Sequence, residues 1–160
     1  MTHSELCLRA QRWLRSVGCG ITAVDLATIA GEQPDVIGWR YGLTVLCEVK
    51  VSRGDFLADR KKPWRARPGI GMGDWRFYVA PAGMLQPDEI PEGWGLLEWD
   101  EKRLQPRHNV PPGNMWGSPP FAGHKRHEAL ILCSLIRRLE RPKSDRRKAS
   151  KAAQRGEGEG

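Results

Sequence analysis

The sequence predicts an α/β domain in which a central mixed sheet of four to five strands is flanked by helices. Residues 4–17 place apolar side chains at steps of three and four, which is typical of an amphipathic helix. Residues 44–51 alternate between two faces as in a strand, and a second helical pattern begins directly after them. Because 160 residues suffice for one domain with a hydrophobic core, we expect residues 1–140 to form one domain.

The boundaries of the elements follow from capping and breaking residues. Thr2 or Ser4 can cap the first helix, and Gly18 can end it. Ser52 can cap the second helix, and Pro63 can end it. The predicted strands are residues 21–29, a run through 33–38, then 44–51, 75–80 and 95–99, the last placed near an edge, and a final helix is predicted over 124–139.

Two segments are expected to be loops. Residues 66–74 contain three alternating glycines without the Gly-Lys-Ser/Thr ending of a nucleotide-binding P-loop, which favours a flexible connection. Residues 105–120 contain five prolines, so we expect an exposed loop that contributes nothing to the core. Trp116 in this loop either stacks on a nucleic-acid base or anchors the loop, and the anchor is the favoured interpretation.

The positive charge is concentrated near the C-terminus. The net charge is +7, and residues 141–160 contribute +4 through seven Lys or Arg and three acids, which leaves +3 for the rest. This segment has no apolar periodicity, so we expect a disordered basic tail. The balance favours an anionic partner, with nucleic acid ahead of a membrane surface.

Cysteine usage and hydropathy indicate the compartment. The four cysteines are far apart and form no Cys-x-x-Cys pair, which argues against disulfides or a structural zinc. The N-terminus lacks the pattern of a signal peptide, and the longest apolar run, residues 129–136, is too short to span a bilayer. We therefore expect a reduced, soluble protein in the cytoplasm that makes no membrane contact.

The candidate site lies on the predicted hairpin. Glu48 and Lys50 share one strand face, and a turn at residues 40–42 would bring Asp35 beside Glu48. Two carboxylates next to a lysine can bind a hard cation. Alternatively, Asp35 caps a turn and the other two form a solvated pair. Because Glu48 and Lys50 occupy the most hydrophobic strand candidate, where unpaired charge is costly, the functional interpretation is favoured.

Other polar residues allow two interpretations each. Glu5 either favours the start of the first helix electrostatically or points toward Asp35 as an auxiliary ligand. His124, His127 and Glu128 suggest a metal site, but a polar helix start is favoured because no third ligand has suitable spacing. The basic residues of the second helix and just beyond it form either a solvated face or a contact with phosphate. Their position directly after Lys50 favours the phosphate contact. They are Arg53, Arg60, Lys61, Lys62 and Arg65.

These motifs resemble a known superfamily. A helix, three strands, a helix and a strand, with Pro34-Asp35 and Glu48-Val49-Lys50 on adjacent strands, resemble the PD-(D/E)xK nucleases. The run over residues 48–61 is most similar to the MmcB-like family of DNA-repair proteins and related phage proteins. The resemblance covers about half of the chain, and nothing from residue 105 onward contributes to it.

The resemblance implies a restriction-endonuclease-like core over residues 1–140 and a metal-dependent phosphodiesterase. Asp35, Glu48 and the carbonyl of Val49 would bind Mg²⁺, with Mn²⁺ as an alternative ion. Lys50 would orient or help deprotonate the attacking water and balance charge in the transition state. Glu5 would match the superfamily's helix-borne acid.

The leading hypothesis is a Mg²⁺-dependent nuclease acting on DNA in repair or in phage DNA metabolism, in a bacterial or phage-infected cell. Endonuclease and exonuclease activity are both left open, as is a homodimer. The alternative is a non-catalytic nucleic-acid-binding module on the same fold, which would show salt-dependent binding without cleavage. A third hypothesis assigns a protein-interaction role to the loop 105–120, including regulation of a host defence system.

Overall fold

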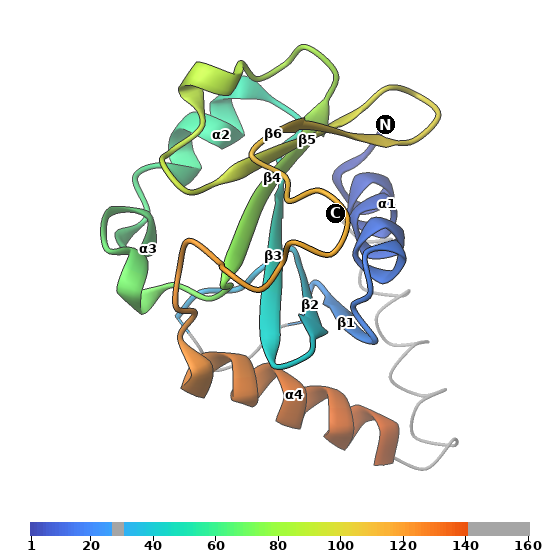
Figure 1. The fold of residues 1–160 in the computed structure, drawn as a ribbon, viewed down its shortest axis with the longest axis vertical. Coiled ribbons are helices and arrows are strands. Elements are labelled where there is room, and N and C mark those ends of the chain that lie inside the picture. The colour runs from blue at the N-terminus through green and yellow to red at the C-terminus, as the bar shows by residue number, and fades with distance from the viewer. Residues whose placement is uncertain (27–30, 141–160) are drawn as a thin grey trace, which may run out of the picture.

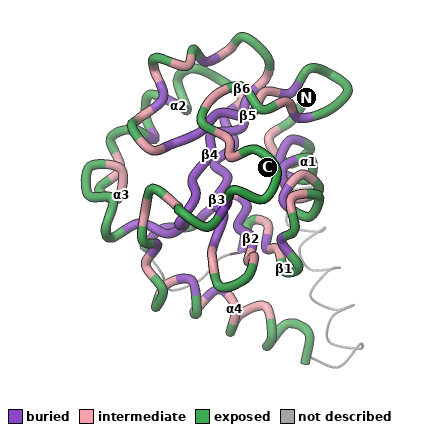
Figure 2. Tube along the Cα trace, in the orientation of Figure 1, coloured by how far each residue is buried: buried purple, intermediate pink, exposed green. Residues whose placement is uncertain are grey.

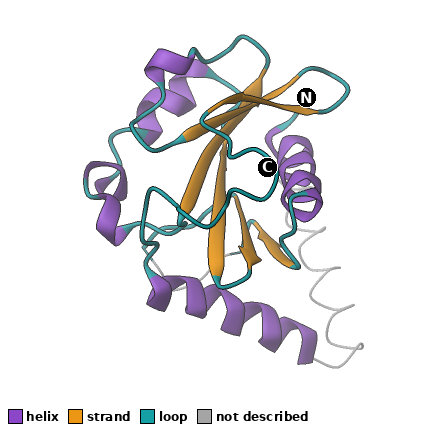
Figure 3. Cartoon of the chain, viewed as in Figure 1, coloured by secondary structure: helices purple, strands orange, loops and turns teal. Residues whose placement is uncertain are grey.

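The computed structural model describes residues 1–26 and 31–140, which contain one six-stranded sheet with helices on both faces (Figures 1 and 3). The strands lie side by side in chain order. The first three strands are antiparallel, the third to fifth are parallel, and the sixth is antiparallel to the fifth. They are β1 (Ile21–Val24), β2 (Val36–Arg40), β3 (Leu43–Val49), β4 (Trp75–Pro81), β5 (Gly95–Trp99) and β6 (Leu104–His108).

The helices cover opposite sides of this sheet. α1 (His3–Ser16) lies on one side, and α2 (Arg53–Asp59) with the short α3 (Pro63–Ala66) lies on the other (Figure 1). α4 (Lys125–Glu140) runs across the end of the sheet near the turn between β2 and β3, and its Ile131 packs into the same core cluster as Phe56 of α2. Two 3₁₀ turns, η1 (Pro68–Ile70) and η2 (Pro87–Glu89), complete the connections.

The predicted α/β class is confirmed, but the strand count of four to five is wrong. The sixth strand, β6, falls mostly within the segment assigned to an exposed loop and makes β5 an interior strand. Pro106 in β6 lacks a backbone donor, which is tolerated on an edge strand because only one side is paired. The sequence of β6, Leu-Gln-Pro-Arg-His, also lacks an alternation of apolar and polar residues, so it gives no strand signal.

Both faces of the central strands are buried, as Figure 2 shows for β3 and β4. On the α1 side, Leu6 and Leu14 join a cluster with Cys47. On the other side, Leu46 joins a cluster with Phe56. Parallel strands covered by helices on both sides are buried on both sides.

The second half of the glycine-rich segment, which was expected to be a flexible loop, packs against the start of α4. Thr44 Oγ1 donates to Glu128 Oε1 at 2.7 Å, and Gly73 N donates to the same oxygen at 2.9 Å. Gly123 N donates to Asp74 Oδ1 at 2.8 Å. Residues 71–74 are buried as a result, so this half of the segment belongs to the core, whereas residues 66–70 are exposed.

Trp116 anchors the segment after β6, as the favoured interpretation predicted, and it belongs to the core that this segment was expected to lack. Its side chain is 3% exposed. Its ring lies 5.6 Å from that of Trp75 and 6.2 Å from that of Phe77, and the indole nitrogen of Trp75 donates to its carbonyl at 2.9 Å. Since a buried ring cannot stack on a base, the alternative role of Trp116 does not apply to this structure.

Several predictions concern the ends of elements. β1 stops at Val24, earlier than the predicted residue 29, and residues 27–30 lie outside the described part. The predicted disordered tail, residues 141–160, also lies outside the described part. Within the described ranges, no helix combines the length and apolar character that crossing a membrane requires.

Candidate metal and phosphodiester site

Asp35, Glu48 and Lys50 come together where β2 begins and β3 ends. The sheet register pairs Val36 with Cys47, so Asp35, one residue earlier, lies across from Glu48. Asp35 Oδ2 accepts a hydrogen bond from the backbone N–H of Val49 at 2.7 Å. Lys50 Nζ donates to Glu48 Oε2 at 3.2 Å. The hairpin therefore brings together the three side chains that the sequence pattern singled out.

A cleft of about 270 Å³ opens over this point, and we call it the Asp35 cleft. Helix α1 contributes one side of its lining and α2 the other, with the end of β3 between them. Its lining residues are His3, Asp35, Val49, Lys50, Asp55, Ala58, Asp59 and Lys62. The cleft thus combines three carboxylates with an imidazole and two ammonium groups.

Glu48 lies beneath the cleft and does not line it. Its side chain is 2% exposed, and burial raises its pKa to about 7 even though Arg65 and Lys50 favour the charged form. Glu48 Oε1 is 3.1 Å from Arg65 Nη2, in a geometry that makes no hydrogen bond, so this buried oxygen has no hydrogen-bond partner. A buried carboxylate oxygen in this state can accept a further positive ligand.

Arg65, which was predicted to contact phosphate, lies in a buried cluster of ion pairs in this structure. Its guanidinium is 4% exposed and lies within 3.1 Å of three buried carboxylates, with N–O distances of 2.8, 3.1 and 2.7 Å. Buried carboxylates need a buried counter-charge, and the planar fork of arginine can serve several at once. The three partners are Glu32, Glu48 and Asp59.

Asp59 is a component of the site that the sequence analysis missed. Tyr78 donates its hydroxyl proton to Asp59 Oδ2 at 2.8 Å, and Lys50 Nζ lies 3.3 Å from Asp59 Oδ1. Burial opposes ionisation, but hydrogen bonds and charge from Arg65 outweigh it and hold the Asp59 pKa well below its usual range. The available signal was its position three residues after Phe56, on the inward face of α2.

Lys50 is held between two acids. Burial disfavours its charged form, but the neighbouring carboxylates of Glu48 and Asp59 outweigh this and raise the Lys50 pKa. The Lys50 side chain is 7% exposed and lines the Asp35 cleft. It therefore presents a fixed ammonium group to whatever enters the cleft.

Glu5 lies outside this cluster. It stabilises the start of α1, which is the first of the two interpretations given for it above. Its carboxylate accepts a hydrogen bond from Thr2 N at 2.8 Å in a capping box, which lowers its pKa. Two residues correspond to about 200° around a helix, so His3 rather than Glu5 faces the cleft. His3 Nε2 lies 3.4 Å from Asp35 Oδ2.

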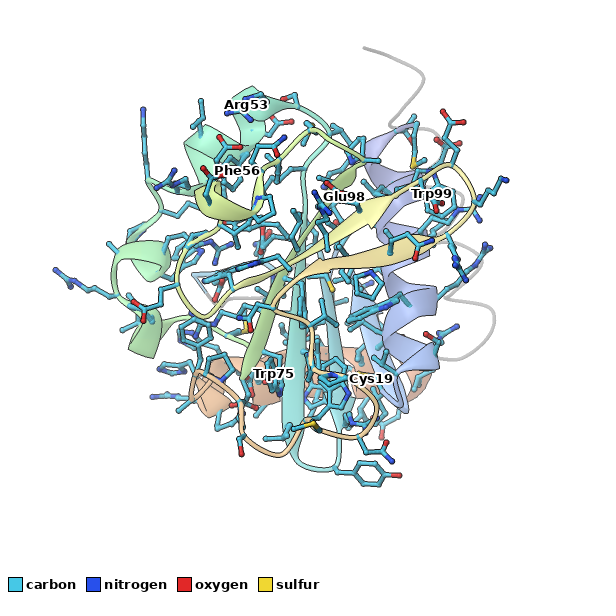
Figure 4. The ribbon with its side chains drawn as sticks, turned by 45° about the horizontal axis from the view of Figure 1, so that its top comes forward. Cys19, Arg53, Phe56, Trp75, Glu98 and Trp99 are labelled. Atoms are coloured by element: carbon cyan, nitrogen blue, oxygen red, sulfur yellow. The ribbon has the colours of Figure 1, made fainter. Side chains whose placement is uncertain are left out.

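The other basic residues are divided between the cleft and the surface. Lys62 lines the cleft and lies 2.7 Å from Asp59. Arg60 and Lys61 are exposed at the end of α2. Arg53, at the start of α2, lies near the outside of the molecule (Figure 4). It pairs with Glu89 of η2, which offsets its charge.

The histidine pair at the start of α4 and a hollow beside Trp116 are weaker candidates for a functional site. His124 and His127 stack with ring centroids 3.8 Å apart, while Glu128 is occupied by Thr44 and Gly73, which agrees with a polar helix start. A larger hollow of about 550 Å³ lies against Trp116 and the end of α1, and its lining contains no carboxylate.

Comparisons with known proteins inform the fold alone. No protein-family model matches the chain, and no curated protein matches it. A solved structure described as SPO1766, a protein of unknown function from Silicibacter pomeroyi, is similar, with a TM-score of 0.62 and 22% sequence identity. The match covers 100% of this chain and 97% of that one. At this identity the similarity extends to the fold and to nothing finer.

Proposed function

We propose that this protein is a Mg²⁺-dependent nuclease that hydrolyses DNA phosphodiester bonds on a restriction-endonuclease-like core of the PD-(D/E)xK type. The observation that carries the proposal is the convergence of Asp35, the Val49 backbone and Lys50 on one cleft, with Glu48 directly beneath. The mixed sheet, in which a β2–β3 hairpin precedes a parallel β3–β4 pair, is compatible with such a core.

The donor set suits a hard cation. Mg²⁺ and Mn²⁺ prefer oxygen ligands, and Glu48 Oε1 is a buried carboxylate oxygen without a hydrogen-bond partner. Asp35, Glu48 and the carbonyl of Val49 would hold the ion. When bound, Mg²⁺ polarises a phosphate oxygen and lowers the pKa of a coordinated water.

The protein's own groups prepare this chemistry. The Val49 N–H fixes one oxygen of Asp35, which orients its carboxylate at the cleft. Lys50, kept protonated by Glu48 and Asp59, donates to the water or to a non-bridging phosphate oxygen and offsets the negative charge that develops in the transition state.

DNA is the proposed partner because the site needs a phosphodiester and the chain carries a net charge of +7. Lys62 at the cleft, with Arg60 and Lys61 exposed beside it, would contact the phosphates that flank the scissile bond. Arg53 and Arg65 do not line the cleft, and Arg65 is buried, so both are left out of this role. DNA repair or phage DNA metabolism in the cytoplasm is the proposed setting.

The test is cleavage of plasmid, nicked, branched and single-stranded DNA in the presence of Mg²⁺, Mn²⁺ or EDTA. Asp35→Asn and Lys50→Met should each lower cleavage by at least about 100-fold, while circular dichroism stays unchanged. Glu5→Gln, outside the cluster, is the matched control and should cut normally. Cleavage by both site variants at the wild-type rate would refute the assignment. Salt-dependent binding without cleavage of any substrate would favour the non-catalytic module instead.

A further inference from the structure

A second group of ligand-type side chains lies beside the Asp35 cleft. His3 and Cys7 are one helical turn apart on α1 and share a face. Asp25 follows β1, where its backbone N–H donates to the Asp35 carbonyl at 3.0 Å. One ligand atom from each of these three residues lies within 4.8 Å of the other two.

The spacing of these atoms suits a tetrahedral metal. A Zn–S bond of about 2.3 Å and a Zn–N bond of about 2.0 Å place tetrahedral ligand atoms about 3.5 Å apart. Cys7 Sγ is 3.6 Å from His3 Nδ1. The Asp25 side chain is exposed, so its carboxylate can rotate toward the ligand atoms of His3 and Cys7, which already lie within 4.8 Å of it.

The other ring nitrogen of His3 has the partner that a metal-bound histidine requires. A ligating imidazole usually directs its second N–H at a carboxylate, which fixes the ring and increases its basicity. His3 Nε2 lies 3.4 Å from Asp35 Oδ2. Cys7 Sγ lies 3.6 Å from His3 Nδ1 and 3.9 Å from His3 Nε2, so the sulfur is beside the ring. A turn of the ring, whose side chain is 39% exposed, directs Nδ1 at an ion bound to this sulfur.

The local potential also favours a cation. Burial, followed by the charges of Asp35, Asp25 and Glu48, raises the pKa of Cys7 to about 12. The same carboxylates attract a divalent ion, whose charge reverses this effect on the thiol. On binding, the S–H bond breaks, an S–metal bond forms, and the proton leaves to solvent.

We propose that Cys7 Sγ, His3 Nδ1 and the Asp25 carboxylate bind a borderline-soft divalent cation, for which Zn²⁺ is the expected ion. Thiolate and imidazole ligands select Zn²⁺ over Mg²⁺, so this site is chemically distinct from the all-oxygen set at Asp35 and Glu48. Three protein ligands leave a fourth position open to water or a further ligand. The inference does not depend on the proposed nuclease activity.

Cobalt(II) serves as the probe, because a tetrahedral thiolate site gives it intense visible bands and a near-ultraviolet thiolate-to-metal charge-transfer band. The full-length protein is stripped with a chelator and titrated with Co²⁺. We expect both signals to saturate at one equivalent and to disappear when Zn²⁺ is added. Absence of the charge-transfer band in the wild-type protein would overturn the proposal.

Variants identify the ligands. Cys7→Ser should abolish the charge-transfer band, whereas Cys133→Ser, which removes an exposed thiol on α4, should retain it. Because Cys7 is buried, Asp25→Asn at the surface provides a second variant that tests the site without disturbing the core. Loss of an outer-shell partner already costs about 10–100-fold in affinity, so loss of this ligand should weaken Co²⁺ binding by at least about 100-fold. Unchanged affinity in Asp25→Asn, or a band that survives in Cys7→Ser, refutes the assignment.

The two proposals fail separately. A protein that cuts DNA in Mg²⁺ but gives no thiolate band lacks the second site and keeps the first. A protein that gives the band and cuts no DNA has the second site alone.

Discussion

Replacing Arg65 with methionine should destabilise the protein far more than a usual change of a charged residue. Methionine keeps most of the apolar stem and removes the guanidinium. Three carboxylates, each 1–2% exposed, then lose their shared cation. Removing one partner of a buried ion pair costs about 3–5 kcal/mol because the other charge stays buried and uncompensated.

The assay is thermal and urea unfolding followed by tryptophan fluorescence. Trp94 reports directly on the change, since the Arg65 guanidinium lies 4.6 Å from its ring centroid. For a protein of this size, each kcal/mol shifts the melting temperature by about 2–4 °C, so a decrease of roughly 6–20 °C is expected. Arg53→Met is the matched control: its pair with Glu89 is exposed and should contribute little to stability.

The pH dependence separates loss of charge from loss of packing. Without Arg65, the Glu48 pKa should rise above its value of about 7, because the guanidinium is the main group that lowers it. Acidification toward pH 5 should then protonate this carboxyl and narrow the stability difference from the wild type. The reasoning is refuted if Arg65→Met costs no more than Arg53→Met, or if the cost is the same at pH 5 and pH 8.

Three further changes test other parts of the structure. Burial raises the Glu48 pKa from 4.5 to about 7, so the folded state holds this proton to a higher pH than the unfolded state. The free energy of unfolding of the wild type, compared with that of Glu48→Gln, should therefore fall by about 3 kcal/mol as the pH rises from 4.5 to 7. Urea denaturation at a series of pH values measures this difference. Trp116→Ala should cost about 3–5 kcal/mol in the same assay, whereas Met115→Ala, at a side chain 71% exposed, should stay within about 0.5 kcal/mol; equal costs would remove Trp116 from the core. Gly73→Ala should lower the free energy of unfolding clearly more than Gly42→Ala, for which a loss of about 1–2 kcal/mol is expected. Both glycines have a positive φ. An added Cβ lies 2.6 Å from a β3 side chain at Gly73, whereas at Gly42 it meets open space. Similar melting temperatures for these two variants would contradict the close packing.

Local patterns predicted the arrangement of the hairpin well. Alternation along residues 44–51 and the turn before them determine which residues of β2 and β3 face each other, so the proximity of Asp35 and Glu48 could be inferred without a structure. The first helix was equally predictable, because its caps and its apolar repeat agree.

Contacts between distant elements were not predictable in this way. Arg65 and Asp59 join the site only because α2 and α3 fold over the end of β3, and no short-range pattern shows which charges become buried together. Similarly, a helix-borne acid looked suitable at position 5, but the capping box directs Glu5 outward and leaves His3 facing the cleft. Asp25 gave no sequence signal of its own, because the ligand-type side chains beside it, His3 and Cys7, come from α1.

The order of the strands also bears on self-association. A sheet that is not closed into a barrel offers its outermost backbone groups to other chains, and proteins limit this hazard with short borders, prolines and charges. Here one border, β1, has four residues, and the other, β6, contains Pro106 followed by the exposed Arg107. Within the described residues both borders carry these protections, which disfavours the addition of a second copy to the sheet.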